Sequence, residues 1–162
     1  MIVISDTSPV NNLAAIGQLS LLQQLYETLI IPEAVYEELI GPPPEAGAEE
    51  ARNSNWIQVQ SATDRAIVKA LMSKRLHIGE SEAIALALEI GADQVLVDDK
   101  SARNAAEDAG LRVTGIVGIL IEAKSQGLIS EIRPLLDLLR SPVNFWISES
   151  LYRLALRTAK EI

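Results

Sequence analysis

The 162-residue chain contains no cysteine, which excludes disulfide bonds, thiolate metal sites and a cysteine nucleophile. It contains a single histidine, His77, so a zinc site built on several histidines is excluded, and a Ser-His-Asp triad would need that residue. Aromatic residues make up only 4% of the chain, so Leu, Ile, Val and Ala must form most of the core. The missing cysteines fit a reducing compartment, and we expect a cytoplasmic protein.

Long hydrophobic runs and an excess of basic residues are also missing. No run approaches the ~18 apolar residues of a membrane-spanning helix, and Asp6 interrupts the first apolar run, which argues against a signal peptide. We therefore expect no membrane partner. The chain has 22 acidic and 14 basic residues, a net charge of −8. This balance argues against a general nucleic-acid-coating protein but not against a nuclease, whose metal site can be built from carboxylates.

Short apolar runs rich in β-branched residues predict five strands, over residues 2–5, 28–31, 56–60, 94–97 and 111–115. Apolar periodicity and helix-end signals predict helices over 18–26, from Pro32, over 64–75 and 79–90, from Lys100 to Gly110, and over much of 116–160. Strands that alternate with helices predict an α/β fold with a central parallel sheet and helices on both faces. The length predicts one domain over residues 1–162, with a core of about 1–125 and a helical C-terminal extension of about 126–162.

Carboxylates follow two of the predicted strands. Asp6 comes after the first strand, and Asp98 and Asp99 come after the fourth. Because ligands bind beyond the carboxyl ends of parallel strands, these three side chains meet in one site if the two strands are neighbours. Helix capping is the alternative interpretation for each of them. However, one cap needs one acid, and a cation would relieve the repulsion between the two adjacent acids.

Two predicted helices carry further candidate acids. Glu38 lies beside the apolar face of the helix that follows Pro32, whereas Glu37 is turned further away. Glu80 and Glu82 are separated by about 200° around their helix, so they cannot both face one site. Glu80 is the better candidate because its side of the helix carries the more buried residues. The alternatives are a solvated surface charge for Glu38 and favourable acid placement at a helix N-terminus for Glu80 or Glu82.

A carboxylate set without cysteine or several histidines implies Mg²⁺ or Mn²⁺, ions that position phosphates and activate water for phosphodiester cleavage. Lys100 and Arg103 are the best candidates for phosphate contacts, since they lie closest to the acidic edge. Basic clusters over residues 65–75 and 153–160 are more often solvated helix faces. His77 precedes the helix that carries Glu80, but a single histidine in a loop is more often incidental than functional.

Four segments together resemble the PIN-domain family of metal-dependent ribonucleases: VISDTSPV, IPEAVYEELI, HIGESEAIALALEIGA and VLVDDKSARNAAEDAGL. The resemblance implies an α/β/α sandwich in which four acids around a groove bind one or two Mg²⁺ or Mn²⁺ ions and cleave RNA. Carried over to this sequence, the acids are Asp6, Glu38, Glu80 with Glu82 as a competitor, and Asp98 or Asp99, with Thr7 or Ser8 as a polar neighbour of the first acid.

Two features depart from the family's pattern. The third acid is a glutamate where the family usually has an aspartate, and the fourth is a doublet with Arg103 one helical turn beyond Asp99. The segments DTSP, GE and DD most resemble a prokaryotic branch whose members are similar to toxins of toxin–antitoxin pairs. The resemblance therefore implies an RNA substrate, an antitoxin as partner, and a homodimer or higher oligomer.

Three other functions compete with this interpretation. A receiver-type signalling domain needs an acceptor aspartate after a central strand, but Ser61, Ala62 and Thr63 follow the third predicted strand. A haloacid-dehalogenase-type phosphatase needs an aspartate two residues after the first, where this chain has Ser8. In the third alternative the chain is an interaction module without activity, in which the acids bind metal for stability and the apolar C-terminal helices contact a partner.

Overall fold

The computed structural model describes all 162 residues and contains one five-stranded sheet in the order β3-β2-β1-β4-β5. All four neighbouring pairs are parallel. The strands are β1 (Val3–Ser5), β2 (Leu29–Pro32), β3 (Ile57–Gln60), β4 (Gln94–Leu96) and β5 (Val113–Thr114). The helices are α1 (Thr7–Ala15), α2 (Ser20–Tyr26), α3 (Glu33–Ile40), α4 (Ala48–Asn53), α5 (Arg65–Ser73), α6 (Ile78–Ile90), α7 (Lys100–Asp108), α8 (Ile116–Ser125), α9 (Arg133–Arg140) and α10 (Glu149–Thr158). The prediction of five parallel strands alternating with helices is confirmed, and four of the strands are shorter than the sequence suggested.

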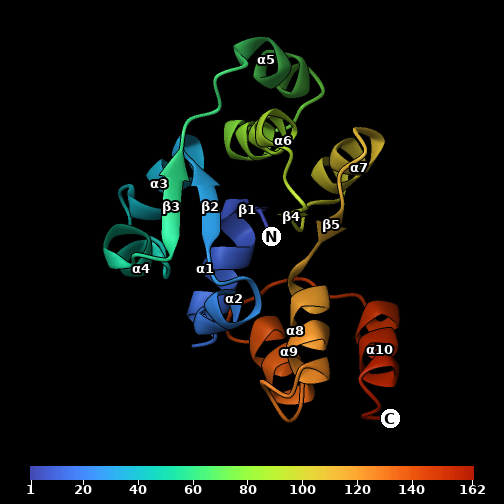
Figure 1. Cartoon of the computed structure of the whole chain (residues 1–162). Coiled ribbons are helices and arrows are strands. Elements are labelled where there is room, and N and C mark those ends of the chain that lie inside the picture. The colour runs from blue at the N-terminus through green and yellow to red at the C-terminus, as the bar shows by residue number, and fades with distance from the viewer.

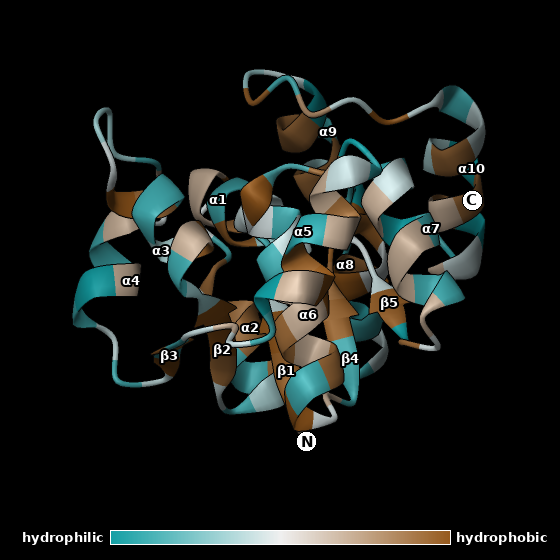
Figure 2. Cartoon of the chain, turned by 90° about the horizontal axis from the view of Figure 1, so that it is seen from above, coloured by the Kyte–Doolittle hydropathy of each residue, from teal (hydrophilic) through white to brown (hydrophobic).

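Two hydrophobic cores lie on opposite faces of the sheet, because successive residues of a strand point to opposite sides. Val3 belongs to a core of 28 buried residues with α1, α2, α8, α9 and α10. The next residue, Ile4, belongs to a core of 14 buried residues with α5, α6 and α7. In Figure 1 the green to yellow helices α5–α7 lie at one end of the picture and the orange to red helices α8–α10 at the other. The fold is a three-layer α/β/α sandwich, as expected, and Figure 2 shows brown, hydrophobic residues in β1, β2 and β4.

The segment 126–162, predicted as a helical C-terminal extension, packs into the larger core. Leu136 and Leu139 of α9 and Leu156 of α10 are at most 1% exposed and belong to the same cluster as the residues of α1 and α2. The two C-terminal helices thus help to cover one face of the sheet. None of the ten helices combines the length and apolar character that crossing a bilayer requires.

The predicted ends of the helices are mostly correct within two residues, and two details are wrong. As expected, Gly91 ends α6 in the left-handed conformation, with φ of 65°. Pro32 was placed in the first turn of a helix, but its extended backbone makes it the last residue of β2, and α3 starts at Glu33. Helix α4 was not predicted, because its six residues are too few to produce a clear apolar period.

Candidate metal centre

The candidate site lies at the carboxyl ends of β1 and β4, which are neighbours in the centre of the sheet. Ser5 pairs with Leu96, and the Asp6 N–H donates to the Leu96 carbonyl at 2.9 Å. This register brings Asp6 beside the turn that begins with Asp98 and Asp99. β1 and β4 are therefore neighbours, as the hypothesis that Asp6, Asp98 and Asp99 share one site required.

Asp6 occupies the N-cap position of α1 without capping that helix. Its side chain makes no cap hydrogen bond, so helix capping does not explain this aspartate. The residue is only 3% exposed, and its Oδ1 atom is buried without a hydrogen-bond partner. Two other buried side-chain oxygens share this property, one in Glu50 and one in Ser81, but neither residue lines the cavity at the site. Because an unpartnered buried carboxylate oxygen is costly, Asp6 is placed to bind a cation.

Glu38 reaches the site from α3. The Thr7 hydroxyl donates a hydrogen bond to Glu38 Oε2 at 2.7 Å, which joins the first turn of α1 to α3. On its other side the carboxylate faces α6 at Gly79. A β-carbon at Gly79 would lie 2.5 Å from Glu38 Oε1, so the glycine allows this close approach. Thr7 and Gly79 together fix the position of the second predicted acid.

Glu80 and His77 come from the start of α6. The His77 N–H donates to Glu80 Oε1 at 3.2 Å, and His77 Nδ1 accepts the Gly79 N–H at 3.2 Å. His77 Nδ1 also lies 3.6 Å from Glu38 Oε1, and its Nε2 lies 3.6 Å from Glu80 Oε1. The reciprocal bonds at the helix start form a capping box. They hold both side chains toward Asp6.

His77 is the site residue that the sequence interpretation undervalued. Asp6, His77 and Glu80 each offer one ligand atom, and these atoms lie within 4.8 Å of one another. A single histidine placed directly before a Gly-Glu helix start is the signal that could have found it. Its position at the N-cap turns its ring back over the first turn of α6.

Burial and mutual repulsion perturb the acids of this cluster. Burial, with smaller contributions from the negative charges of Glu80 and Glu38, raises the pKa of Asp6 to about 7, although a hydrogen bond from the Thr7 backbone and the nearby His77 oppose the shift. Burial also raises the pKa of Glu80. The negative charges of Asp99 and Glu38 raise this pKa as well, whereas His77 lowers it. Carboxyl groups with raised pKa values at the edge of a cavity indicate a functional site, and a divalent cation would remove the repulsion that contributes to the shift.

The two adjacent aspartates have different surroundings. Asp98 Oδ1 accepts the Ile116 N–H at 2.8 Å, and Asp98 Oδ2 accepts the Ser8 hydroxyl at 3.2 Å. Asp99 is exposed, caps α7 through Oδ2 at the Ala102 N–H, and acts electrostatically on Glu80. Asp98 therefore joins α1, β4 and α8, whereas Asp99 keeps its second oxygen free for the cavity.

Glu82, the competitor of Glu80, is engaged elsewhere. Its Oε1 accepts the Ala34 N–H at 3.0 Å, and its Oε2 pairs with Arg65 at 2.9 Å. These bonds secure the start of α3 and the start of α5 against α6. The structure thus separates Glu82 from the acids at the end of β1, as the helical rotation between the two glutamates required.

The predicted phosphate contacts lie on the other side of Asp98. Arg103 lowers the pKa of Asp98, which burial raises, and a β-carbon at Gly115 would lie 2.9 Å from Arg103 Nη1. Lys100 is exposed at the first turn of α7. Both basic residues line a second cavity that begins at Asp98, and neither lines the acidic one.

An open cavity of about 780 Å³ contains the site. Its lining includes five of the predicted acids, all except Glu82, together with Thr7, Ser8 and His77. The five acids are Asp6, Glu38, Glu80, Asp98 and Asp99. The rest of its lining consists of Asn11, Asn12, Arg75 and Ser101, together with Phe145 and Trp146 of the loop before α10. The donors fit a hard divalent cation, because carboxylate oxygens dominate the set and the Asp6 Oδ1 atom has no partner within the protein.

Fold and site together define an α/β/α protein with a carboxylate centre at the carboxyl ends of its central strands. A family model described as a PIN domain matches residues 2–161, and the chain therefore belongs to the PIN-domain family. PIN domains are generally nucleases that use divalent metals. Comparisons with the curated proteins and with the solved structures find no match to the chain.

Proposed function

We propose that the chain is an endoribonuclease that depends on Mg²⁺ or Mn²⁺ and cleaves phosphodiester bonds in RNA. The observation that carries the proposal is the buried Asp6 carboxylate. Its Oδ1 atom has no hydrogen-bond partner, and one of its oxygens lies within 4.8 Å of ligand atoms of His77 and Glu80. Membership of the PIN-domain family supports the same reaction class.

We assign metal binding to Asp6, Glu38, Glu80 and Asp99. A divalent cation held there supplies positive charge that stabilises the transition state of phosphodiester cleavage and activates water. The neighbouring side chains position these acids. Thr7 orients Glu38 through its hydroxyl, and the capping box at the start of α6 orients Glu80.

We assign a positioning role to Asp98. Both of its oxygens already accept hydrogen bonds, from the Ile116 N–H and the Ser8 hydroxyl, which supports Asp99 as the fourth acid. Asp99→Asn should then weaken Mn²⁺ binding more than Asp98→Asn does, and Asp98→Asn should lower the melting temperature more. Titration calorimetry and thermal unfolding in the absence of metal separate the two roles. The reverse ranking in both measurements would overturn the assignment.

Cleavage of a labelled single-stranded RNA by the purified chain tests the proposed function. We expect cleavage with Mn²⁺ or Mg²⁺ and none with EDTA, and we expect Asp6→Asn to remove it. Asp108→Asn makes the same chemical change at an exposed position on α7 and should cleave like the wild type. Metal-dependent cleavage that persists unchanged in Asp6→Asn would show that another centre, or a contaminant, is responsible.

The resemblance to toxins supports a narrower proposal about the role of the protein in the cell. We propose that the protein acts in the cytoplasm as the toxin of a toxin–antitoxin pair, that it forms a homodimer or higher oligomer, and that an antitoxin protein blocks it. Induced expression should then arrest bacterial growth, and Asp6→Asn should relieve the arrest. Normal growth at wild-type protein levels that match those of the variant would contradict the toxin role while leaving the nuclease proposal intact.

A metal-binding interaction module without activity is the second candidate. The complete hydrogen bonding of Asp98 favours it, because one of the predicted acids already serves the fold. Mn²⁺ would then raise the melting temperature of the wild type without cleavage of any RNA tested. The receiver alternative lacks support, because β3 lies at the edge of the sheet and not at its centre.

A further inference from the structure

A second cavity, of about 750 Å³, adjoins the acidic one along the β5 edge of the sheet. The two cavities share Asp98, Phe145 and Trp146 as lining residues, so they are continuous at the loop before α10. The second cavity extends from there along α7, β5 and α8. A polymer whose reacting phosphate lies at the acids can therefore continue into it.

The charge of this cavity differs from that of the chain as a whole. Lys100, Arg103 and Arg112 line it, and none of the three forms an ion pair. The only acids in its lining are Asp98 and Glu122. Three unpaired cations in one cavity of a protein with a net charge of −8 favour a polyanionic occupant.

Trp146 is 83% exposed at the junction of the two cavities, although its loop is firmly attached. The Phe145 N–H donates to the Leu139 carbonyl at 2.8 Å, and Ile147 is buried in the larger core. Both neighbours of Trp146 are thus fixed, and its indole lies in solvent. An exposed aromatic side chain on a fixed backbone provides a surface on which a nucleobase can stack.

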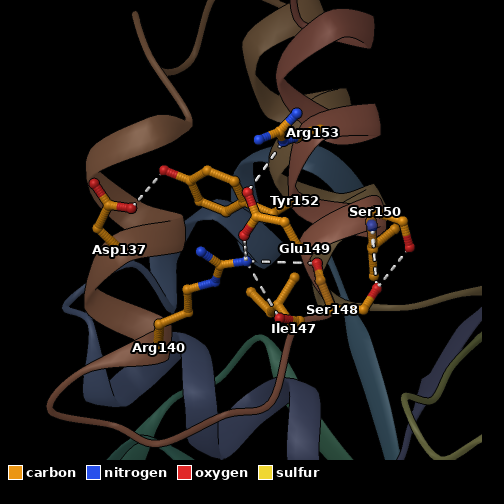
Figure 3. Close-up of polar contacts among 9 residues, drawn as sticks. Asp137, Arg140, Ile147, Ser148, Glu149, Ser150, Tyr152 and Arg153 are labelled. Atoms are coloured by element: carbon orange, nitrogen blue, oxygen red, sulfur yellow. Dashed lines mark hydrogen bonds and ion pairs between the residues drawn. The ribbon is translucent and has the colours of Figure 1, made fainter.

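Arg140 holds the end of the same loop through hydrogen bonds. Its Nη2 donates to the carbonyls of Ile147 at 3.3 Å and Ser148 at 3.5 Å, and it pairs with Glu149 at 3.2 Å. The guanidinium also lies 3.8 Å above the centre of the Tyr152 ring. Figure 3 shows this arrangement, in which one arginine on α9 ties the end of the loop to the start of α10.

We propose that the second cavity binds the part of a single-stranded RNA that flanks the cleaved phosphate, an inference that rests on the proposed function. Trp146 stacks on a base next to the acids, and Lys100, Arg103 and Arg112 contact the following phosphates. The inference adds a base-stacking site and a direction for the strand, from the acids toward the β5 edge. Charge complementarity and continuity with the acidic cavity favour RNA over an apolar partner.

Binding measured in EDTA tests this site independently of cleavage. The probe is a fluorescein-labelled 12-nucleotide oligouridylate, followed by anisotropy at low salt. We expect Trp146→Ala to weaken binding roughly 5- to 150-fold, the range for loss of one stacked base, and Trp146→Phe to retain most of the affinity. Leu154→Ala, at an exposed apolar residue of α10 outside the cavity, is the control and should bind like the wild type.

Charge neutralisation tests the phosphate contacts. Combined replacement of Lys100, Arg103 and Arg112 by Gln should reduce the slope of log affinity against log salt by about 2, since each single-strand phosphate contact contributes about 0.7. The control replaces Lys69, Lys74 and Arg157 by Gln, which makes the same change in net charge at exposed positions outside the cavity. Equal slopes for the two triple variants would overturn the inference.

The fluorescence of Trp146 gives a third measurement. The chain has two tryptophans, so Trp56→Phe leaves Trp146 as the only indole. We expect the oligouridylate to quench it. If dilution without RNA instead changes its emission and Trp146→Ala dissociates a dimer, a second copy covers the loop and the inference is wrong. RNA binding as expected without cleavage contradicts only the proposed function, whereas cleavage and binding that are unchanged in Trp146→Ala contradict only this inference.

Discussion

Two carboxylates in this molecule, Glu161 and Asp6, have opposite surroundings. Glu161, near the C-terminus, accepts the N–H groups of Ile132 and Arg133 at 2.7 and 3.0 Å and pairs with Lys124 at 3.0 Å. Although burial raises its pKa, these hydrogen bonds bring the pKa of Glu161 below its ordinary value. Asp6 has an unpartnered oxygen and a pKa raised to about 7.

The difference separates a structural carboxylate from one that we propose to bind a metal. Glu161 has a lysine and two backbone donors, so its charge is stabilised within the protein and supports the packing of α9 against the C-terminus. Asp6 has acidic neighbours and no cationic lysine or arginine in an ion pair with it. Within the protein, a hydrogen bond from the Thr7 backbone and the nearby His77 favour its charged form, but burial outweighs them. A cation supplied from outside would stabilise the charge, which is what a metal centre requires.

The largest expected effect is on catalysis. Asp6→Asn should reduce the rate of Mn²⁺-dependent RNA cleavage by about 1,000-fold. The variant lacks a negative charge that would hold the metal ion, and the transition state needs that ion. Glu161→Gln should reduce the rate less than threefold. Single-turnover cleavage with saturating enzyme measures both. Similar losses in the two variants would remove the distinction between the carboxylates.

The next effect concerns the stability of the metal-free protein. The pKa of Asp6 is raised in the folded state, so between about pH 4 and 7 the folded chain binds more protons than the unfolded chain, and stability falls as pH rises. From pH 5 to 8 in EDTA, the wild type should lose about 1–3 kcal/mol of unfolding free energy more than Asp6→Asn does. Urea unfolding at the two pH values measures this difference, and equal losses would contradict a raised pKa at Asp6.

Removal of Glu161, the structural carboxylate, should lower the stability of the protein without changing its metal affinity. Glu161→Ala leaves the Ile132 and Arg133 N–H groups without an acceptor and Lys124 without its carboxylate partner, so we expect a loss of about 2 kcal/mol in unfolding free energy. Mn²⁺ affinity should remain unchanged. Urea unfolding and calorimetry provide the two values, and a variant as stable as the wild type would show that these bonds contribute little.

The smallest effect concerns the orientation of Glu38. Thr7→Val keeps the shape of the side chain but removes the hydroxyl that donates to Glu38 Oε2, and we expect Mn²⁺ affinity to fall about tenfold. Thr158→Val is the matched control, because that hydroxyl donates to the Leu154 carbonyl on the distant α10. Titration calorimetry compares the two variants. An affinity loss as large in the control would point to a general effect of the substitution.

The sequence predicts the layers better than it predicts the site. Alternating strands and helices are sufficient for the sandwich, because they follow from local periodicity. Sequence alone does not establish that β1 and β4 are neighbours, since strand order depends on long-range pairing. Nor could it distinguish Asp98 from Asp99, because their difference depends on Ser8 and the Ile116 N–H.

The two hydroxyls after Asp6 also have consequences for the order of events during synthesis. Thr7 contacts a residue 31 positions later, and Ser8 contacts one 90 positions later. Contacts of such separation form slowly and only after the distant partner has been made. The centre therefore cannot assemble on a growing chain until β4 and the turn after it have left the ribosome. A nascent chain, surrounded by RNA, would carry the first acids of a nuclease without its activity.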